Sequence, residues 1–547
     1  MKKIQIGYTN LFKYILFFTF YMVQNVKADG YYFFVQFTDK NNSTYSLQQP
    51  EEFLSQRAIQ RRLNQGISCD STDLPVNELY LSQITDLGMD IHHTSKWMNS
   101  ATLVLEDSTN IAQIRALDFV RFVEYTGRKI DPKYAPQSKI KKFVEEYNHG
   151  DATTQTDLLN GKVLHNAGYT GKDIHIALLD AGFYQANINT AFDSLRLQNR
   201  LLGAVNICDN SRDTYMSDSH GSNVLSIMAA NYPNQYLGSA PHASYWLIQT
   251  EEPLGEYKVE LDFLVRGFEF ADSVGIDIIN ISLGYYEFDD DRMDFTYADM
   301  DGKTARSSIA ANIASQKGII VCSSAGNEGN KAWKYVCSPG DAEGIITVGA
   351  VNNYGNIAAF SSFGPSSDQR VKPDLCATGL GTAYVNSYGH NDFGNGTSYS
   401  SPLLAGFMAC YLQAYKENIS HPYNIQTIIN QVVSTADRYH NPDNQYGYGI
   451  PDFQEAMENI GYNNLKTTAA DIYANIRYLS HNKSLEIDIQ ASTIPIDIKI
   501  YSITGTILFA KTISEATTID LSNFENALYL VQISTDKQSY TQKILIH

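Results

Sequence analysis

The sequence predicts a central α/β domain with a doubly wound, mostly parallel sheet, a small α+β domain before it and a small β-sandwich after it. Three observations support this fold class. Between residues 151 and 460 short apolar runs alternate with helical patterns, which is typical of a parallel sheet covered on both faces. Before residue 127 strand and helix patterns are mixed, and after residue 466 apolar and polar residues alternate one by one.

Composition and charge narrow the class of protein. Apolar residues make up 43% of the 547 residues and charged residues 18%, which is enough to bury sizeable cores. The formal net charge of −18 has the wrong sign for binding nucleic acid, whose phosphates attract clustered Lys and Arg. Six cysteines without a C-x-x-C pair argue against a disulfide scaffold and a zinc ribbon. We expect no nucleic-acid partner, no metal ligands and no cofactor.

Residues 1–28 are predicted to be a secretion signal. Three lysines and a ten-residue apolar run, 14–23, precede a small residue at Ala28. A membrane-spanning helix needs about 20 apolar residues, so a cleaved signal peptide is favoured over an uncleaved anchor. The mature chain is therefore expected to be exported and to have no integral membrane span.

Residues 29–127 are predicted to form the first α+β domain. Its expected elements are a strand from Tyr31, helices over 53–63 and 79–87, and strands over 101–105 and 119–123. The polar stretch 128–150 follows, with two prolines and a cluster of lysines, and is typical of a linker.

The central domain, 151–460, and the last domain, 466–547, differ in their periodicity. The expected central strands lie at 174–179, 245–248, 276–280 and 318–321. In such open sheets, sites gather at the carboxyl ends of the strands. The last domain alternates strictly, for example over 485–490 and 496–500, which predicts a small β-sandwich.

Three reactive side chains follow a strand or begin a helix. Asp180 follows an apolar strand, so its carboxylate would be partly buried and would need a hydrogen-bonding partner. His220 begins a helical run, where the helix dipole disfavours imidazolium and keeps the ring a base. Ser398 precedes the helical run 403–415, whose N–H groups would stabilise a developing negative charge. Taken singly, these residues could equally be a turn cap, a solvated loop histidine and an N-cap serine.

The three residues occur in the order Asp, His, Ser, and their surroundings resemble a known family. The segments are Leu178-Leu179-Asp180-Ala181-Gly182, Asp218-Ser219-His220-Gly221-Ser222 and 395–402. They resemble the active-site signatures of the subtilisin-like serine peptidases, and the order differs from that of chymotrypsin-like enzymes and α/β-hydrolases. The resemblance implies a subtilisin-like fold and acyl transfer, with Ser398 as nucleophile, His220 as general base and Asp180 orienting the imidazole.

Two further stretches extend the resemblance. The Ser-Ala-Gly-Asn stretch that ends at Asn327 is similar to the family's Ala-Gly-Asn element, which implies that Asn327 donates to the oxyanion together with the N–H of Ser398. The alternative is an asparagine in a left-handed turn. The stretch Ser282-Leu283-Gly284 resembles the family's Ser-Leu-Gly strand, which implies that these residues pair with the substrate backbone.

The first domain resembles the inhibitory propeptides of the same family, notably over 53–62 and 73–76. This resemblance implies a zymogen whose processing site lies in the linker 128–150 and which cleaves itself. A permanent accessory domain is the alternative.

The last domain resembles the sorting domain of the type IX secretion system, through 498–505, 529–533 and 543–546. The resemblance implies a partnership with the type IX machinery and a secreted or cell-surface protein that travels via the periplasm. A carbohydrate-binding or spacer sandwich is the alternative.

Two minor features remain open. The acidic residues between 287 and 301 could hold a structural calcium ion but lack a ligand-loop spacing, so a solvated loop is favoured. Cys322 and Cys337 either form a bridge in an oxidising compartment or stay free thiols.

The sequence as a whole therefore predicts a secreted serine endopeptidase that acts on protein or peptide substrates and is autoprocessed. A catalytically silent surface-binding module with the same fold is one alternative. A lipase or esterase is another, which the residue order and the absence of a Gly-x-Ser-x-Gly stretch around Ser398 disfavour.

Overall fold

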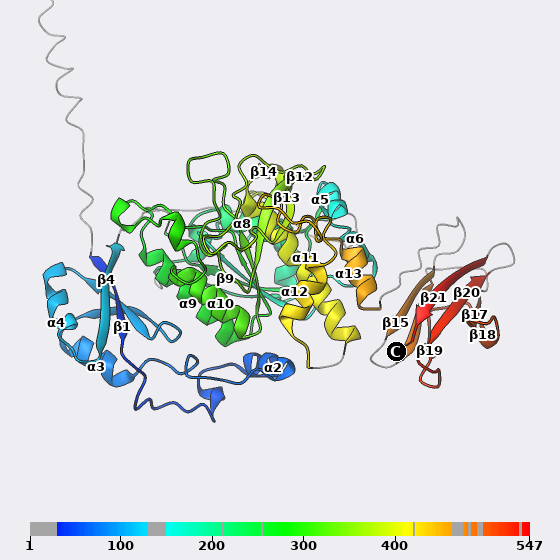
Figure 1. The fold of residues 1–547 in the computed structure, drawn as a ribbon, viewed down its shortest axis with the longest axis horizontal. Helices are drawn as coiled ribbons and strands as arrows, with labels where there is room; N and C mark the ends of the chain where they lie inside the picture. The colour runs from blue at the N-terminus through cyan, green and yellow to red at the C-terminus, as the bar shows by residue number, and fades with distance from the viewer. Residues whose placement is uncertain are drawn as a thin grey trace, which may run out of the picture.

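The computed structural model describes most of the chain and arranges it in three parts (Figure 1). The described residues are 30–129, 149–209, 212–232, 234–252, 255–419, 422–461, 474–479, 483–489, 496–534 and 539–546. The predicted signal, 1–28, and most of the linker, 130–148, lie outside them. No helix in the described ranges is long and apolar enough to cross a membrane.

The N-terminal part is a four-stranded antiparallel sheet, in the order β2-β3-β1-β4, with three helices. Its elements are β1 (Tyr31–Phe37), α2 (Gln56–Gln65), α3 (Glu78–Asp86), β2 (Asp90–Ser95), β3 (Ser100–Leu105), α4 (Ile111–Arg115) and β4 (Val120–Arg128). Strand β1 is buried on both faces. Phe33 and Val35 pack in the core of this part, while Tyr32 and Phe34 pack against the central part. The predicted α+β fold is confirmed, and the sheet is docked on its neighbour.

The central part is built on an eight-stranded sheet in the order β14-β13-β12-β11-β10-β5-β9-β6. The strands are β5 (His175–Asp180), β6 (Leu201–Asn206), β9 (Ser244–Gln249), β10 (Ile278–Ile281), β11 (Ile320–Ser324), β12 (Ile346–Asn352), β13 (Leu375–Val385) and β14 (Asn391–Asn395). All neighbours pair in parallel except β13 and β14. A separate hairpin joins β7 (Asn231–Tyr232) and β8 (Tyr236–Leu237). The predicted mostly parallel sheet is confirmed.

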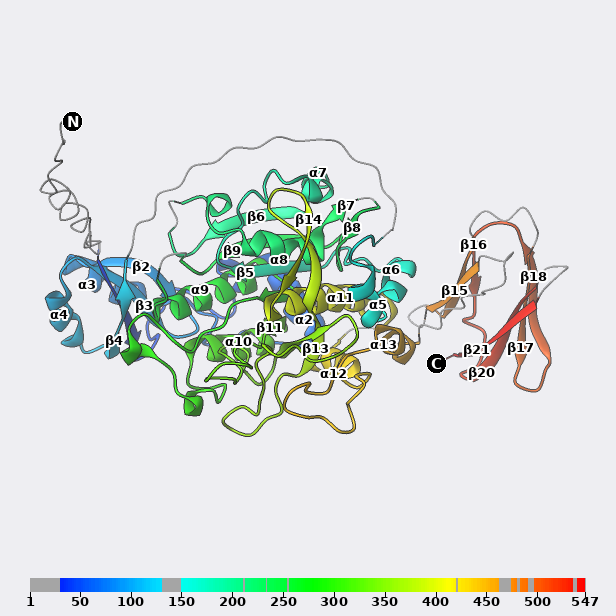
Figure 2. The same cartoon turned by 90° about the horizontal axis from the view of Figure 1, so that it is seen from above.

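Helices cover both faces of this sheet, as Figure 2 shows from above. They are α5 (Thr153–Leu158), α6 (Lys162–Asn166), α7 (Asp193–Leu197), α8 (His220–Ala229), α9 (Val259–Val274), α10 (Arg306–Gln316), α11 (Thr397–Asn418), α12 (Ile425–Val433) and α13 (Phe453–Asn459). Successive residues of β5 divide between the faces. Ile176 and Leu178 pack with α8 and α11, whereas Ala177 and Leu179 pack with α9 and α10. An unbroken apolar strand is therefore the expected sequence here.

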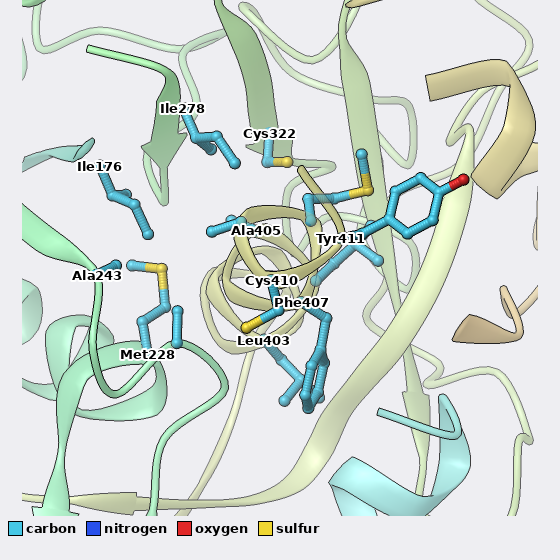
Figure 3. Close-up of a cluster of buried hydrophobic side chains, with 14 of the residues drawn as sticks. Ile176, Met228, Ala243, Ile278, Cys322, Leu403, Ala405, Phe407, Cys410 and Tyr411 are labelled. Atoms are coloured by element: carbon cyan, nitrogen blue, oxygen red, sulfur yellow. The ribbon is translucent and has the colours of Figure 1, made fainter. Parts of the chain in front are cut away.

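Helix α11 runs through the core of the central part. Figure 3 shows Ile176, Ile278 and Cys322, from three neighbouring strands, around its side chains. The helix begins at Thr397, earlier than the predicted run 403–415. The prediction starts too late because the first turns of the helix are rich in serine and contain Pro402. Proline has no N–H for the carbonyl four residues earlier, that of Ser398.

The C-terminal part consists of two antiparallel sheets. One contains β15 (Ala474–Leu479), β16 (Ser484–Ile489) and β19 (Thr517–Asp520), and the other β18 (Ile507–Ile513), β17 (Ile496–Ser502), β20 (Leu528–Ser534) and β21 (Ser539–Leu545). Leu485 and Ile487 from the first sheet share one core with Ile498 and Val531 from the second. The predicted small β-sandwich is confirmed.

Candidate active site

The predicted site residues gather at one edge of the central sheet. Asp180 is the last residue of β5, Ser282 follows β10 and Asn327 lies just beyond β11. These three strands are neighbours and run parallel, so their carboxyl ends meet at the same edge. His220 and Ser398 reach this edge in the first turns of α8 and α11.

Asp180 and His220 are joined directly. The His220 Nδ1 atom lies 2.7 Å from Asp180 Oδ1, and the N–H of Ala181 also donates to that oxygen at 2.9 Å. Asp180 is fully buried, while the His220 side chain is 30% exposed. A buried acceptor on Nδ1 fixes the tautomer of the ring and leaves Nε2 as the nitrogen available for proton transfer.

The charges around His220 favour its protonated form, contrary to the expectation that the helix dipole would disfavour imidazolium. Burial lowers the pKa of the ring, but the charge and hydrogen bond of Asp180 outweigh burial and raise this pKa to about 9. Glu251 also raises it, and was missed by the sequence analysis. Burial, followed by the charges of Glu256 and Asp180, raises the pKa of Glu251 itself to about 8. The acidic pair after β9, a strand that ends at this same edge, was the signal that could have indicated Glu251.

Ser398 lies in the first turn of α11, where backbone N–H groups are free of intrahelical partners. Ser282 Oγ donates to Ser398 O at 2.9 Å and replaces the N–H that Pro402 lacks. Tyr399, the next residue, places its ring centre 6.4 Å from that of His220. Within the described chain the Ser398 hydroxyl makes no hydrogen bond to His220. Such contacts commonly tighten only when substrate is bound.

Asn327 and Ser398 both lie close to Gly396. The N–H and hydroxyl of Thr397 donate to Asn327 Oδ1 at 2.9 and 3.1 Å. Because an N–H group only donates, the carboxamide oxygen must face Thr397, and Nδ2 points the other way. A Cβ on Gly396, whose φ is +156°, would lie 2.8 Å from Ser398 Oγ and 3.8 Å from Asn327 Nδ2. The glycine therefore leaves room for an atom between these two groups.

The predicted substrate-binding residues Ser282, Leu283 and Gly284 continue from β10 beside the segment that carries Asn327. Ser324 Oγ donates to Leu283 O at 3.3 Å and joins the two segments. A Cβ on Gly284 would lie 3.1 Å from Cys337 Cβ, so little space separates these neighbours. Both segments lie at the edge that carries Asp180.

The structure places both of the features that the sequence left open. The acidic residues cap turns and pair locally: Asp294 accepts from Phe288 N at 2.7 Å, and Asp290 pairs with Arg292. The described residues contain no group of three or more His, Cys, Asp or Glu side chains that could hold a metal ion. Cys322 and Cys337 are free thiols.

Comparisons with known proteins assign each of the three parts to a family of known sequences. The model of the Subtilase family matches residues 171–449, that of the Peptidase S8 propeptide domain of Bacteroidota 32–142, and that of the Secretion system C-terminal sorting domain 481–547. Subtilisin NAT of Bacillus subtilis subsp. natto is 27% identical over 303 residues, which cover 55% of this chain and 70% of that protein. Serine protease AprX of Bacillus subtilis is 28% identical over 292 residues, which cover 48% and 62%.

A solved structure shares the fold. The epidermin leader peptide processing serine protease of Staphylococcus aureus superposes with a TM-score of 0.52 at 15% identity, over 79% of this chain and 99% of that one. A serine peptidase built on a parallel α/β sheet is the class of protein that these comparisons define. The chain belongs to the subtilase family and is a subtilisin-like serine endopeptidase that acts on proteins. Its propeptide and sorting domains imply a secreted or cell-surface protein.

Proposed function

We propose that Asp180, His220 and Ser398 are the catalytic triad of this endopeptidase. The observation that carries the proposal is the 2.7 Å contact between His220 Nδ1 and the buried Asp180, at the edge where α11 begins with Ser398. Ser398 Oγ attacks the scissile carbonyl carbon while His220 Nε2 takes its proton. His220 then gives this proton to the leaving amine, and the acyl-enzyme forms. Water, activated by the same ring, hydrolyses the acyl-enzyme and restores the serine.

The proposed oxyanion site consists of Asn327 Nδ2 and the N–H of Ser398. The support is the orientation of the carboxamide, set by two hydrogen bonds from Thr397, and the space left open by Gly396. Donors held in advance stabilise a charge that appears only in the transition state. Ser282, Leu283 and Gly284 are proposed to bind the substrate backbone as an added strand.

Replacing Asn327 with alanine tests the oxyanion assignment. We expect kcat to fall by about 10²- to 10³-fold, a magnitude taken from subtilisin itself, with little change in KM, because the lost bond forms only in the transition state. Steady-state kinetics on a peptide amide would measure this. Asn441→Ala, at an exposed asparagine, is the control. A rise in KM at unchanged kcat would instead assign Asn327 to ground-state binding.

Labelling with a fluorophosphonate tests the nucleophile. The reagent phosphonylates only an activated serine, so we expect a single label on the peptide that carries Ser398. Ser219→Ala, next to His220 in the sequence, should still be labelled, and Ser398→Ala should not. An unlabelled but folded wild-type protein would favour the silent binding module, and a label elsewhere would remove Ser398 from the triad.

The flanking parts are proposed to serve processing and export. Residues 29–127 would be the propeptide, 128–150 the linker with the processing site, 151–460 the peptidase domain and 466–547 the sorting domain. The support is that β4 ends at Arg128, where the linker begins, and that Gly127 lies against Tyr257 of the central part. The type IX machinery would recognise the sorting domain after passage through the periplasm.

A further inference from the structure

The loop that follows β9 borders the candidate active site. Thr250 N donates to Asp180 O at 3.0 Å, so the loop begins beside the proposed triad. The next residue is Glu251, a half-buried carboxylate whose charge acts on His220. Because β9 and β5 are parallel neighbours, both strands end at the edge where the reacting groups are proposed to meet. The loop therefore lies where a bound substrate would pass.

Three glutamates of this loop and of the first turn of α9 lie close together: Glu251, Glu256 and Glu260, here called the glutamate cluster. Glu252 N donates to Glu260 Oε1 at 2.9 Å, which holds the start of α9 against the loop. Burial, followed by the charges of Glu251 and Glu256, raises the pKa of Glu260 well above its usual value. Among the described residues, no member of the cluster forms an ion pair with Lys or Arg. Their mutual repulsion is therefore left uncompensated.

Two buried oxygen atoms beside the glutamate cluster have no partner. The Glu260 side chain belongs to a residue that is 1% exposed, and within the described chain its Oε2 atom accepts no hydrogen bond. Tyr285 is also 1% exposed, and its hydroxyl makes no hydrogen bond to any described residue. Burial raises the pKa of Tyr285 well above its usual value, and the charges of the whole cluster raise it further, so this ring lies beside the cluster. Unpaired buried oxygens are costly, which points to a ligand that donates hydrogen bonds.

Tyr285 also connects the glutamate cluster to the proposed path of the substrate. It directly follows the substrate-binding segment 282–284, whose last residue, Gly284, is exposed. Farther along, Asp289 N donates to Glu256 O at 2.8 Å and joins this stretch to the glutamate loop. Glu251 and Glu256 are only half-buried, so the cluster is open to solvent on one side. A side chain of a peptide bound along 282–284 can therefore reach the cluster.

The chemistry of the glutamate cluster selects a cationic side chain as its ligand. The three carboxylates are close enough to repel one another, but the described residues contain no group of three or more His, Cys, Asp or Glu side chains that could hold a metal ion. A guanidinium group carries positive charge, only donates hydrogen bonds and spreads five N–H groups over a plane, so it can reach several separate oxygens. An ammonium group has the same charge and three donors.

We propose that the glutamate cluster recognises an arginine or lysine side chain of the substrate, at one fixed position near the bond that is cut. The inference rests on the proposed function and names the substrate class of the same active site. The incoming cation compensates the repulsion among the carboxylates, and its N–H groups reach the unpartnered oxygens of Glu260 and Tyr285. Binding energy gained away from the reacting bond helps to hold the scissile carbonyl in place for attack.

Digestion of a random peptide library by the full-length protein, followed by sequencing of the products, is the first test. We expect arginine and lysine to be enriched about 10- to 100-fold at one position near the cut, the range that a hydrogen bond to a charged group contributes. Two peptide amides that differ only in arginine or glutamine at that position then give a ratio of kcat/KM values. Any effect of Glu251 on His220 is common to both peptides and cancels in this ratio.

Glu251→Gln should lower the ratio by about tenfold, because the carboxamide has nearly the same shape but no charge. Glu256→Gln is a second variant with the same expected direction. The control is Glu343→Gln, which removes the same charge at an exposed residue just before β12, at the opposite edge of the sheet. This control should keep the wild-type ratio.

Equal cleavage of the arginine and glutamine peptides by a protein that fluorophosphonate labels at Ser398 would overturn the recognition site and leave the proposed function standing. A protein that is neither labelled nor active would overturn both. An equal fall of the ratio in Glu251→Gln and Glu343→Gln would assign the preference to the net charge of the whole chain, and would also overturn the recognition site.

Discussion

Ser398→Ala is expected to lower kcat by about 10⁶-fold, the magnitude seen for loss of this residue in subtilisin. Alanine removes the attacking oxygen, while Asn327 and the substrate-binding segment stay in place. KM should therefore change little, and a residual rate above that of water should remain. Hydrolysis of a peptide amide, with the remaining activity corrected for contaminating protease, measures the effect.

The matched control is Ser400→Ala, in the same helical turn. Ser400 Oγ donates to Thr397 O at 3.0 Å and has no part in the proposed reaction. Because such a bond contributes only about 1 kcal/mol to stability, kcat should stay close to that of the wild type. A Ser398→Ala protein with more than a few per cent of wild-type kcat would show that the nucleophile lies elsewhere.

The Ser398→Ala variant also tests whether the protein cuts its own linker or another peptidase cuts it. Wild-type protein should yield a mature chain that begins between about residues 128 and 151, whereas Ser398→Ala should keep the linker intact. N-terminal sequencing of both proteins distinguishes these outcomes. Equal processing of both would assign the cut to another peptidase and would leave the kinetic prediction untouched.

Much of the fold follows from local patterns, and the exceptions have physical reasons. The apolar strand that ends at Asp180 is predicted because both of its faces are buried. Strand β2 is missed because its sequence is polar and most of its side chains are only half-buried, so no alternation is visible. The start of α11 is missed because Pro402 stands inside the helix, and its missing N–H is replaced by the hydroxyl of Ser282, which is far away in sequence.

The candidate site likewise contains residues that the sequence predicts and residues that it does not. The motif residues can be listed from the sequence, because each has a recognisable neighbourhood. The groups that tune them come from elsewhere in the chain: Glu251 acts on the charge of His220, and Thr397 sets the orientation of the Asn327 carboxamide. The contacts of α2 with the central part could not be predicted for the same reason, since Arg61 and Arg62 meet Asp272 only in the folded chain.

Asp180→Asn should lower kcat by about 10⁴-fold, because asparagine neither fixes the productive tautomer of His220 nor stabilises the imidazolium. It should also move the pH profile. In the wild type Asp180 outweighs burial and raises the pKa of His220 to about 9, and only the neutral ring accepts a proton. The wild-type kcat/KM should therefore rise with pH through about 9. Without the charge of Asp180, the rise of kcat/KM should occur at lower pH.

The same pair links folding stability to pH. A raised pKa means that the folded state holds the proton more tightly than the unfolded state, whose value is 6.5. The stabilisation is complete below pH 6.5 and is lost as the pH rises through about 9. The Tm of the wild type should therefore fall relative to that of Asp180→Asn over this window, and Asp213→Asn, at an exposed carboxylate, should follow the wild type. If Tm and kcat/KM depended on pH in the same way in the wild type and in Asp180→Asn, then Asp180 would not set the charge of His220.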